Sequence, residues 1–211
     1  MIEEYITLIK GYPGLFRFYQ VKRRMFPIEK CLAHFPRRGT LVDLGCGNGL
    51  LTGLICLRAP QMQVIGMDDD QRKLATARKV FDDFETLRFL RGNIVEAALP
   101  KGDHFALVDV LYLIDFPAQE KILASICRSM PENGFLLLKE MDKKPLYKYW
   151  FNIFQETVSV KLLGRTLGGR FYFRSRKEMV SLLKKVGFAN VEAIPLHRGY
   201  LYPHILYRAT R

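Results

Sequence analysis

The sequence of 211 residues has few features of metal-binding, secreted or membrane-spanning proteins. Its four cysteines, at 31, 46, 56 and 127, form no Cys-x-x-Cys pair, so we expect buried thiols, a reducing compartment and no metal site. The longest apolar stretch, residues 41–57, contains Asp43, Asn48 and closely spaced glycines, which argues against a membrane span. The start Met-Ile-Glu-Glu lacks the pattern of a signal peptide, and a cytoplasmic location is predicted.

The positive charge of the chain is unevenly distributed. Residues 1–40 carry a net charge of +5 and residues 141–190 one of +8, whereas residues 41–140 sum to −3. Basic segments of this kind attract an anionic partner, such as nucleic acid, a membrane surface, an acidic protein, or a carboxylate or phosphate substrate. Solvated basic faces without a partner are the alternative.

Short apolar runs alternate with helical patterns along the middle of the chain. Strands are predicted at 41–44, 63–67, 87–90, 105–108, 135–139, 191–196 and 205–209. Helices are predicted at 50–58, from Asp70 onward, around Ile122 to Met130, and at 175–186. This alternation predicts an α/β fold with a doubly wound, seven-stranded, mainly parallel sheet, helices on both faces and a small cap.

The end of the sheet and its additions follow from the same pattern. About nine residues separate the last two predicted strands, too few for a crossover helix, so the last strand is expected to be antiparallel. We assign residues 1–36 to an N-terminal helical cap and residues 37–211 to the main domain, with a cap insertion at 143–173.

A glycine-rich loop, Asp-Leu-Gly-Cys-Gly-Asn-Gly at 43–49, joins the first predicted strand to its helix. Glycines let the backbone turn tightly and approach a nucleotide, and Asp68 ends the next strand, where a carboxylate can accept both ribose hydroxyls. No Gly-Lys-Ser/Thr follows, and Leu50 stands where a dinucleotide-binding loop has glycine or alanine. Asp43 would repel a pyrophosphate but suits an ammonium or sulfonium group.

This loop, followed by Val-Ile-Gly-Met-Asp at 64–68, resembles the first two motifs of class I S-adenosylmethionine-dependent methyltransferases. The resemblance covers residues 38–140 and extends weakly into the last two strands. It implies a Rossmann-like methyltransferase domain with S-adenosyl-L-methionine as cofactor, and it places Asp43 near the amino group of the methionine portion and Asp68 on the ribose. The cofactor-binding residues that it implies are Asp43, Gly45, Cys46, Gly47, Gly49, Asp68, Asp69, Asn93, Ile94 and Asp109.

Two of these positions differ from the family pattern. Asn93 stands where the family usually has an aspartate that receives the adenine amino group, a bond that an asparagine carbonyl can also make. A turn-forming Gly-Asn is the alternative interpretation. Asp69 stands where the family commonly has an apolar residue against adenine.

The sequence says less about the methyl acceptor. The segment 109–113 lacks the Asn/Asp-Pro-Pro-Tyr motif of many amino-methylating relatives and is more similar to small-molecule members, although Leu113 replaces a frequent histidine. Asp109 is expected to contact the cofactor or to serve as a helix cap or turn residue. His197, His204 and Tyr112 are the candidate catalytic residues, and structural roles for the histidines are the alternative.

Aromatic residues with lysines and arginines around them occur at 145–163, at 171–173 and in the terminal hairpin. They suit an acceptor with an aromatic or lipid-like body and an anionic handle, such as a carboxylate, a phosphate or a carrier- or CoA-linked thioester. The alternatives are an RNA methyltransferase whose basic flanks follow phosphates, and a catalytically silent, membrane-peripheral binding module. The missing RNA-binding motif disfavours the first, and the intact glycine loop and acids disfavour the second.

Overall fold

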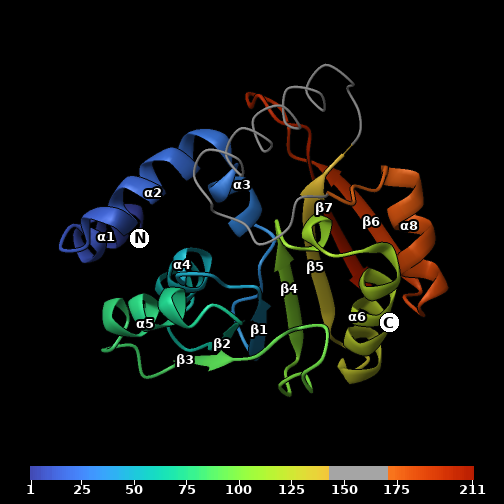
Figure 1. The fold of residues 1–211 in the computed structure, drawn as a ribbon, viewed down its shortest axis with the longest axis horizontal. Coiled ribbons are helices and arrows are strands. Elements are labelled where there is room, and N and C mark those ends of the chain that lie inside the picture. Colours follow the sequence, from blue (N-terminus) through green and yellow to red (C-terminus); the bar gives the residue numbers. More distant parts are fainter. Residues whose placement is uncertain (143–170) are drawn as a thin grey trace.

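The computed structural model describes residues 1–142 and 171–211, whose seven strands form one sheet in the order β3-β2-β1-β4-β5-β7-β6 (Figure 1). The strands are β1 (Thr40–Leu44), β2 (Gln63–Asp68), β3 (Leu87–Arg91), β4 (His104–Val108), β5 (Phe135–Met141), β6 (Asn190–Pro195) and β7 (His204–Thr210). The first five strands are parallel, and β7 is antiparallel to both neighbours. The predicted sheet is thus confirmed, including the direction of its last strand.

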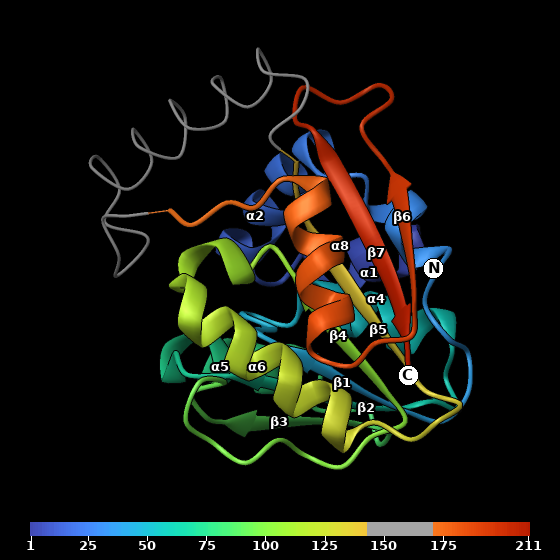
Figure 2. The ribbon, with the colours of Figure 1, turned by 90° about the vertical axis from the view of Figure 1, so that its right-hand side faces the viewer.

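Helices cover both faces of this sheet. They are α1 (Ile2–Ile9), α2 (Pro13–Met25), α3 (Ile28–Leu32), α4 (Leu50–Arg58), α5 (Gln71–Val80), α6 (Phe116–Ser129) and α8 (Arg176–Lys185), with a 3₁₀ turn at Leu111–Leu113. Figure 2 shows α6 and α8 on one face, with α1, α2 and α4 behind the sheet. Each face has its own apolar core, one with residues of α1 to α5 and the other with residues of α6 and α8.

Side-chain caps explain where several helices begin. Asp70 accepts hydrogen bonds from the N–H groups of Arg72 and Lys73 at the start of α5, as predicted for this residue. Asp115 caps α6 through the N–H of Ala118. A reciprocal capping box between Ser175 and Glu178 begins α8.

The N-terminal helices pack against the sheet and against α4. Pro13 at the first position of α2 fits the helix start, where its missing N–H has no intrahelical partner. Tyr5, Leu15 and Tyr19 are buried in the core that these helices share with α4. Most of the predicted cap insertion, residues 143–170, lies outside the described residues.

Two further sequence expectations concern the cysteines and the membrane. All four cysteines are buried and free, as predicted. Within residues 1–142 and 171–211, no helix has the length and apolar character to cross a bilayer.

Candidate functional site

The glycine loop turns directly out of β1. Gly45, Gly47 and Gly49 have φ angles of 78°, 58° and 77°, in the left-handed region that favours glycine. A Cβ on Gly45 would lie 2.5 Å from Cγ2 of Val110, whereas a Cβ on Gly47 would have only the Lys73 side chain nearby, at 3.9 Å. A Cβ on Gly49 would lie 2.9 Å from the rings of Phe81 and Phe89, so the loop is tightly packed at both ends and open at Gly47.

Asp68 ties this loop to the end of β2. Its carboxylate accepts hydrogen bonds from the N–H of Gly47 (2.8 Å) and from the N–H of Asp70 (2.9 Å), and the residue is 8% exposed. Each carboxylate oxygen can accept a further hydrogen bond. The structure thus brings the predicted ribose acid and the glycine loop together and leaves acceptor capacity for two hydroxyls.

Asp43 is a buried carboxylate at the carboxyl end of β1. It is 2% exposed, and its Oδ2 accepts a 2.8 Å hydrogen bond from the Thr52 hydroxyl of α4. Burial raises the pKa of Asp43 to about 6, against the lowering effect of Thr52, and the nearby Asp68 raises it further. A buried carboxylate next to the glycine loop is suited to a positively charged ligand, such as S-adenosylmethionine.

This pKa predicts how cofactor binding depends on pH. A bound ammonium favours the ionised Asp43, so below about pH 6 binding must expel a proton from this carboxyl group. As pH falls below this value, we expect the affinity for S-adenosylmethionine to fall as well, by up to about tenfold for each pH unit. Titration calorimetry at a series of pH values measures this affinity.

A conservative variant provides the control for this pH dependence. Thr52→Val removes the hydrogen bond that lowers the pKa of Asp43, so its affinity should begin to fall at a higher pH than that of the unaltered protein. An affinity that stays constant from about pH 7 to about pH 5 would show that Asp43 does not face the charged group.

The adenine-side predictions fall on turns after β2 and β3. The Oδ1 atom of Asn93 accepts a 3.0 Å hydrogen bond from the N–H of Val95, and Asn93 and Asp69 are both exposed. Asn93 therefore forms the turn of the alternative interpretation, and its contact with adenine stays a prediction. Ile94 packs partly buried against the core on the α6 side, and the N–H of Cys46 donates to the carbonyl oxygen of Met67.

Asp109, just after β4, forms a charged cluster that the sequence did not predict. Its φ of 57° is in the left-handed region, a strained conformation that often marks functional positions. Lys139 of β5 donates from Nζ to Oδ1 of Asp109, and Nζ of Lys22 of α2 lies 3.5 Å from Oδ2. Lys139 is completely buried, with Nζ 4.8 Å from the centre of the Phe26 ring. In the sequence, Lys139 is only a lysine that follows the apolar run 135–138, and that pattern does not indicate its partners.

Burial and charge determine which members of this cluster are ionised. Although burial favours the neutral acid, Lys139 and Lys22 hold the pKa of Asp109 at about 2. Burial lowers the pKa of Lys139, and Asp109 opposes that shift. Glu140 accepts a hydrogen bond from the N–H of Leu111, and burial, followed by Asp109, raises the pKa of Glu140 to about 8.

The three candidate catalytic residues occupy different environments. His204 is 1% exposed, and its Nε2 lies 2.7 Å from the carbonyl oxygen of Met25, so Nε2 carries the proton. Burial and then Lys139 lower the pKa of His204 to about 3, and within the described part of the chain its buried Nδ1 has no hydrogen-bond partner. Tyr112 stacks on Phe173, whereas His197 lies in the connection before β7, where its carbonyl accepts from the N–H of Tyr200.

Aromatic residues gather at the same edge of the sheet. Tyr112 and Phe173 stack with ring centres 5.0 Å apart, and Phe171 lies 5.9 Å from Tyr112. The cluster consists of Tyr112, Met141, Phe173 and Tyr202, with Met25, Leu113 and Phe171 packed against it. The predicted aromatic residues at 147–154 lie outside the described residues.

Two cavities open near the N-terminal helices. One, of about 350 Å³, lies between α2, the glycine loop and the start of α5, and Asn48, Asp70 and Lys73 are among the residues that line it. The other, of about 210 Å³, is lined by residues of α1, α2 and α3 and by Tyr200. Asp43 and Asp68 line neither cavity, and both are buried.

Comparison with known proteins identifies relatives of this arrangement. The sequence profile of a family described as "Methyltransferase domain" matches residues 37–186. Carboxy-S-adenosyl-L-methionine synthase of Helicobacter pylori is 26% identical over 73% of this chain and 70% of its own length. Trans-aconitate 2-methyltransferase of Afipia carboxidovorans is 30% identical over 56% of this chain and 46% of its own.

A solved structure shows the same fold. Human N-acetylserotonin methyltransferase, in complex with S-adenosylmethionine, matches with a TM-score of 0.68 and 22% identity over 88% of this chain. The chain spans 52% of the length of that protein.

Proposed function

The chain belongs to the S-adenosylmethionine-dependent methyltransferase family, and from that premise we propose that it methylates a small, anionic acceptor with an aromatic or lipid-like body. When bound, S-adenosylmethionine supplies a methyl group activated by a positively charged sulfur. The protein must bind the cofactor, align the acceptor and exclude water, and such positioning can contribute about 7–11 kcal/mol.

The cofactor would be held by the residues at the ends of β1 and β2. Asp43 is suited to the ammonium of the methionine portion, Asp68 to the ribose hydroxyls, and the glycine loop to the close approach of the ligand. These assignments are supported by burial and hydrogen bonds that fix both carboxylates before any ligand arrives.

The observation that carries the acceptor proposal is the cluster of Asp109, Lys139 and Lys22 beside the aromatic residues. Two ammonium groups share one carboxylate here, so the three side chains carry a net positive charge. An anionic acceptor would compensate that charge, and the buried Tyr112–Phe173 stack at the same edge would be the apolar neighbour of its body.

The low pKa values of His204 and Asp109, beside the proposed acceptor position, favour an acceptor oxygen that is already ionised. At neutral pH, His204 and Asp109, with pKa values of about 3 and about 2, are weak proton acceptors. A carboxylate needs no base before it accepts a methyl group, whereas an alcohol does. The trans-aconitate methyltransferase relative, whose named substrate is a carboxylate, supports the same class.

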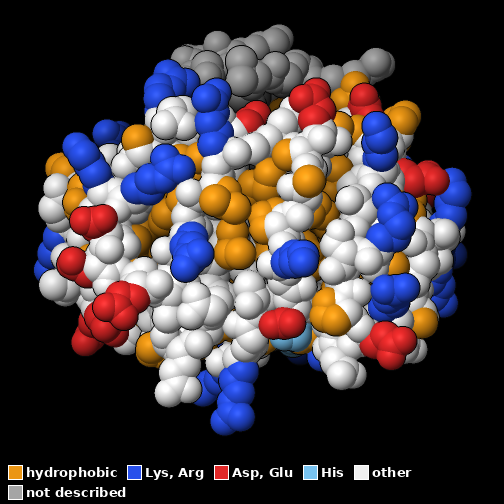
Figure 3. All heavy atoms as spheres, turned by 90° about the horizontal axis from the view of Figure 1, so that it is seen from below, with side chains coloured by type: hydrophobic (Ala, Val, Ile, Leu, Met, Phe, Trp, Pro, Cys, Tyr) orange, Lys and Arg blue, Asp and Glu red, His pale blue; other side chains and the backbone are white. Residues whose placement is uncertain are grey.

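RNA remains the alternative acceptor. On the face seen in Figure 3, lysine and arginine side chains are scattered among acidic, hydrophobic and other side chains. That face offers no continuous basic track for a phosphate backbone.

The proposal predicts the chemistry of the labelled product. We expect S-adenosylmethionine and S-adenosylhomocysteine to bind in calorimetry, and radiolabelled methyl groups to be transferred to members of a panel of aromatic and fatty acids. A methyl ester releases its label in mild alkali, whereas an aryl ether keeps it. Alkali-stable label found only in phenols or RNA, or cofactor binding without any transfer, would contradict the proposal.

A further inference from the structure

The outward face of α2 has no role in the proposed chemistry, yet it combines exposed hydrophobic and basic side chains. We propose that this face docks the protein onto an anionic lipid bilayer. We define the α2 surface as Arg17, Phe18, Val21 and Arg24. Docking there does not depend on which acceptor is methylated.

The apolar side chains of α2 point in two directions. Leu15 and Tyr19 are 4% and 1% exposed and face the protein core. Phe18 and Val21 are 36% and 49% exposed, on the side turned away from that core. A helix that packs on one side and presents a phenylalanine and a valine on the other has hydrophobic surface available for a second contact.

Basic residues surround these two side chains. The helical spacing of i, i+4 and i+7 places Arg17, Val21 and Arg24 on one face, and both arginines are exposed. Between Tyr5 and Ile28 the sequence has five lysines and arginines and no acidic residue. Hydrophobic side chains flanked by arginines are typical of helices that lie in the headgroup region of anionic membranes.

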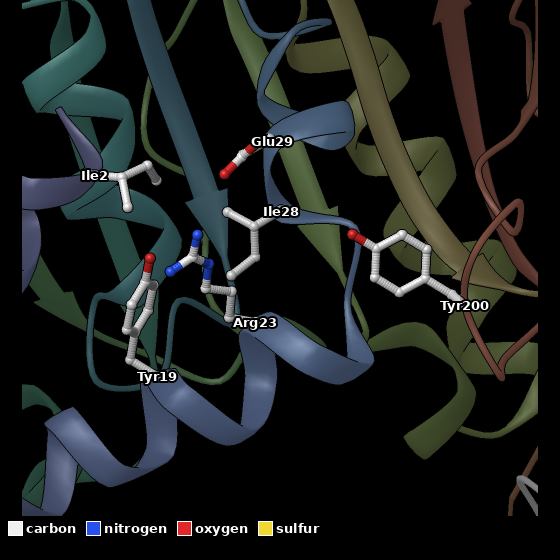
Figure 4. A pocket seen from close by; sticks show the side chains of 6 residues that line it. All are labelled: Ile2, Tyr19, Arg23, Ile28, Glu29 and Tyr200. Carbon is white, nitrogen blue, oxygen red and sulfur yellow. The ribbon is translucent and has the colours of Figure 1, made fainter.

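The connection between β6 and β7 lies beside α3 and the core-facing side of α2. Lys30 of α3 donates a 2.8 Å hydrogen bond to the carbonyl oxygen of Arg198. Tyr19 and Arg23 of α2 line the 210 Å³ cavity together with Tyr200, and Figure 4 shows their side chains around it. The same connection carries Leu201, which is 66% exposed. Tyr19 and Arg23 lie on the side of α2 opposite Val21, so this connection is a neighbour of the helix and not part of the α2 surface.

A bilayer explains both kinds of side chain on the α2 surface. A nucleic acid would pair with the arginines but would leave Phe18 and Val21 without a partner. Lipid headgroups attract the arginines, and the hydrocarbon boundary takes up the two apolar side chains. Lys22 and Met25 belong to the same helix and reach the acceptor edge, so docking would bring that edge close to the membrane.

Vesicle sedimentation with the full chain tests the proposal. We expect sedimentation with vesicles of phosphatidylglycerol and phosphatidylcholine, little with phosphatidylcholine alone, and a loss of binding as salt rises. Arg17→Gln with Arg24→Gln should weaken binding about tenfold or more, because each cation near an anionic surface contributes about fivefold. Phe18→Ser with Val21→Ser should also weaken it, through lost insertion.

Matched variants elsewhere provide the controls. Arg88→Gln with Lys121→Gln removes the same charge from exposed positions on β3 and α6, and Leu90→Ser removes a comparably exposed side chain. These variants should bind like the unaltered protein, and circular dichroism should show that all variants fold. The proposal is overturned if the α2 variants bind as well as the controls. It is also overturned if only the arginine variant loses binding and RNA competes fully with the vesicles, because the surface is then a polyanion site.

Discussion

Replacing Asp68 with alanine is expected to weaken the binding of S-adenosylmethionine by at least about tenfold, or about 1.4 kcal/mol. The carboxylate has two tasks in this structure. It is suited to the ribose hydroxyls, and it already accepts hydrogen bonds from the N–H groups of Gly47 and Asp70. Alanine would remove the ribose contact and release the glycine loop at the same time. Titration calorimetry with the cofactor and with S-adenosylhomocysteine measures the loss.

Two comparisons separate these tasks. Asp68→Asn keeps one carbonyl oxygen as an acceptor, so we expect an affinity between those of the alanine variant and the unaltered protein. Asp82→Ala removes an exposed carboxylate after α5 and should leave the affinity unchanged. If Asp68→Ala folds normally and binds the cofactor as tightly as Asp82→Ala does, the ribose is held elsewhere.

The sheet could be predicted from the sequence because its signals are local. Apolar runs bounded by turn residues located the seven strands, and the short connection before β7 determined its direction. The carboxyl end of β5 was less predictable, because the sequence predicted the strand to end at Lys139, two residues early. The strand continues through Lys139 and Glu140 to Met141, although two consecutive charged residues usually end a buried strand.

Lys139 and Glu140 can be buried in β5 because each has an interaction partner that is distant in the sequence. Lys139 is stabilised by Asp109 and lies against Phe26, whereas Glu140 accepts the N–H of Leu111 on the other side of the sheet. No short pattern distinguishes a buried lysine with such partners from a solvated one. Asp43 and Asp68 could be singled out because each lies at the carboxyl end of a short apolar strand, next to a turn, whereas their hydrogen bonds to Thr52 and Gly47 could not be predicted. Their contacts with the cofactor stay predictions.

The largest effect on stability is expected from Asp109→Asn. Asparagine tolerates the positive φ of this position, so the substitution removes the charge without adding backbone strain. Lys139 then stays buried without its anion, and leaving one charge of a buried pair uncompensated costs about 3–5 kcal/mol. Urea denaturation should show this decrease in the free energy of unfolding.

The stability lost in Asp109→Asn should depend on pH in a defined direction. Burial lowers the pKa of Lys139 below its value in the unfolded chain, and loss of Asp109 lowers it further. At pH values below the pKa of Lys139 in the folded protein, Lys139 is protonated in both states, and its charge is less favourable in the folded one, so the full loss of stability is present. As pH rises above that pKa, Lys139 loses its proton in the folded protein and the loss of stability shrinks. The stability of Asp109→Asn should therefore recover towards alkaline pH.

A double variant tests whether the uncompensated charge of Lys139 causes this loss of stability. Asp109→Asn with Lys139→Met removes both charges and should recover most of the lost stability, since Lys22 is 37% exposed and needs no buried partner. Lys139→Met alone should cost less than Asp109→Asn, because Asp109 keeps Lys22 at 3.5 Å. If the double variant were as unstable as the sum of the two single variants, the loss would come from packing, and the charged cluster would not be a coupled unit.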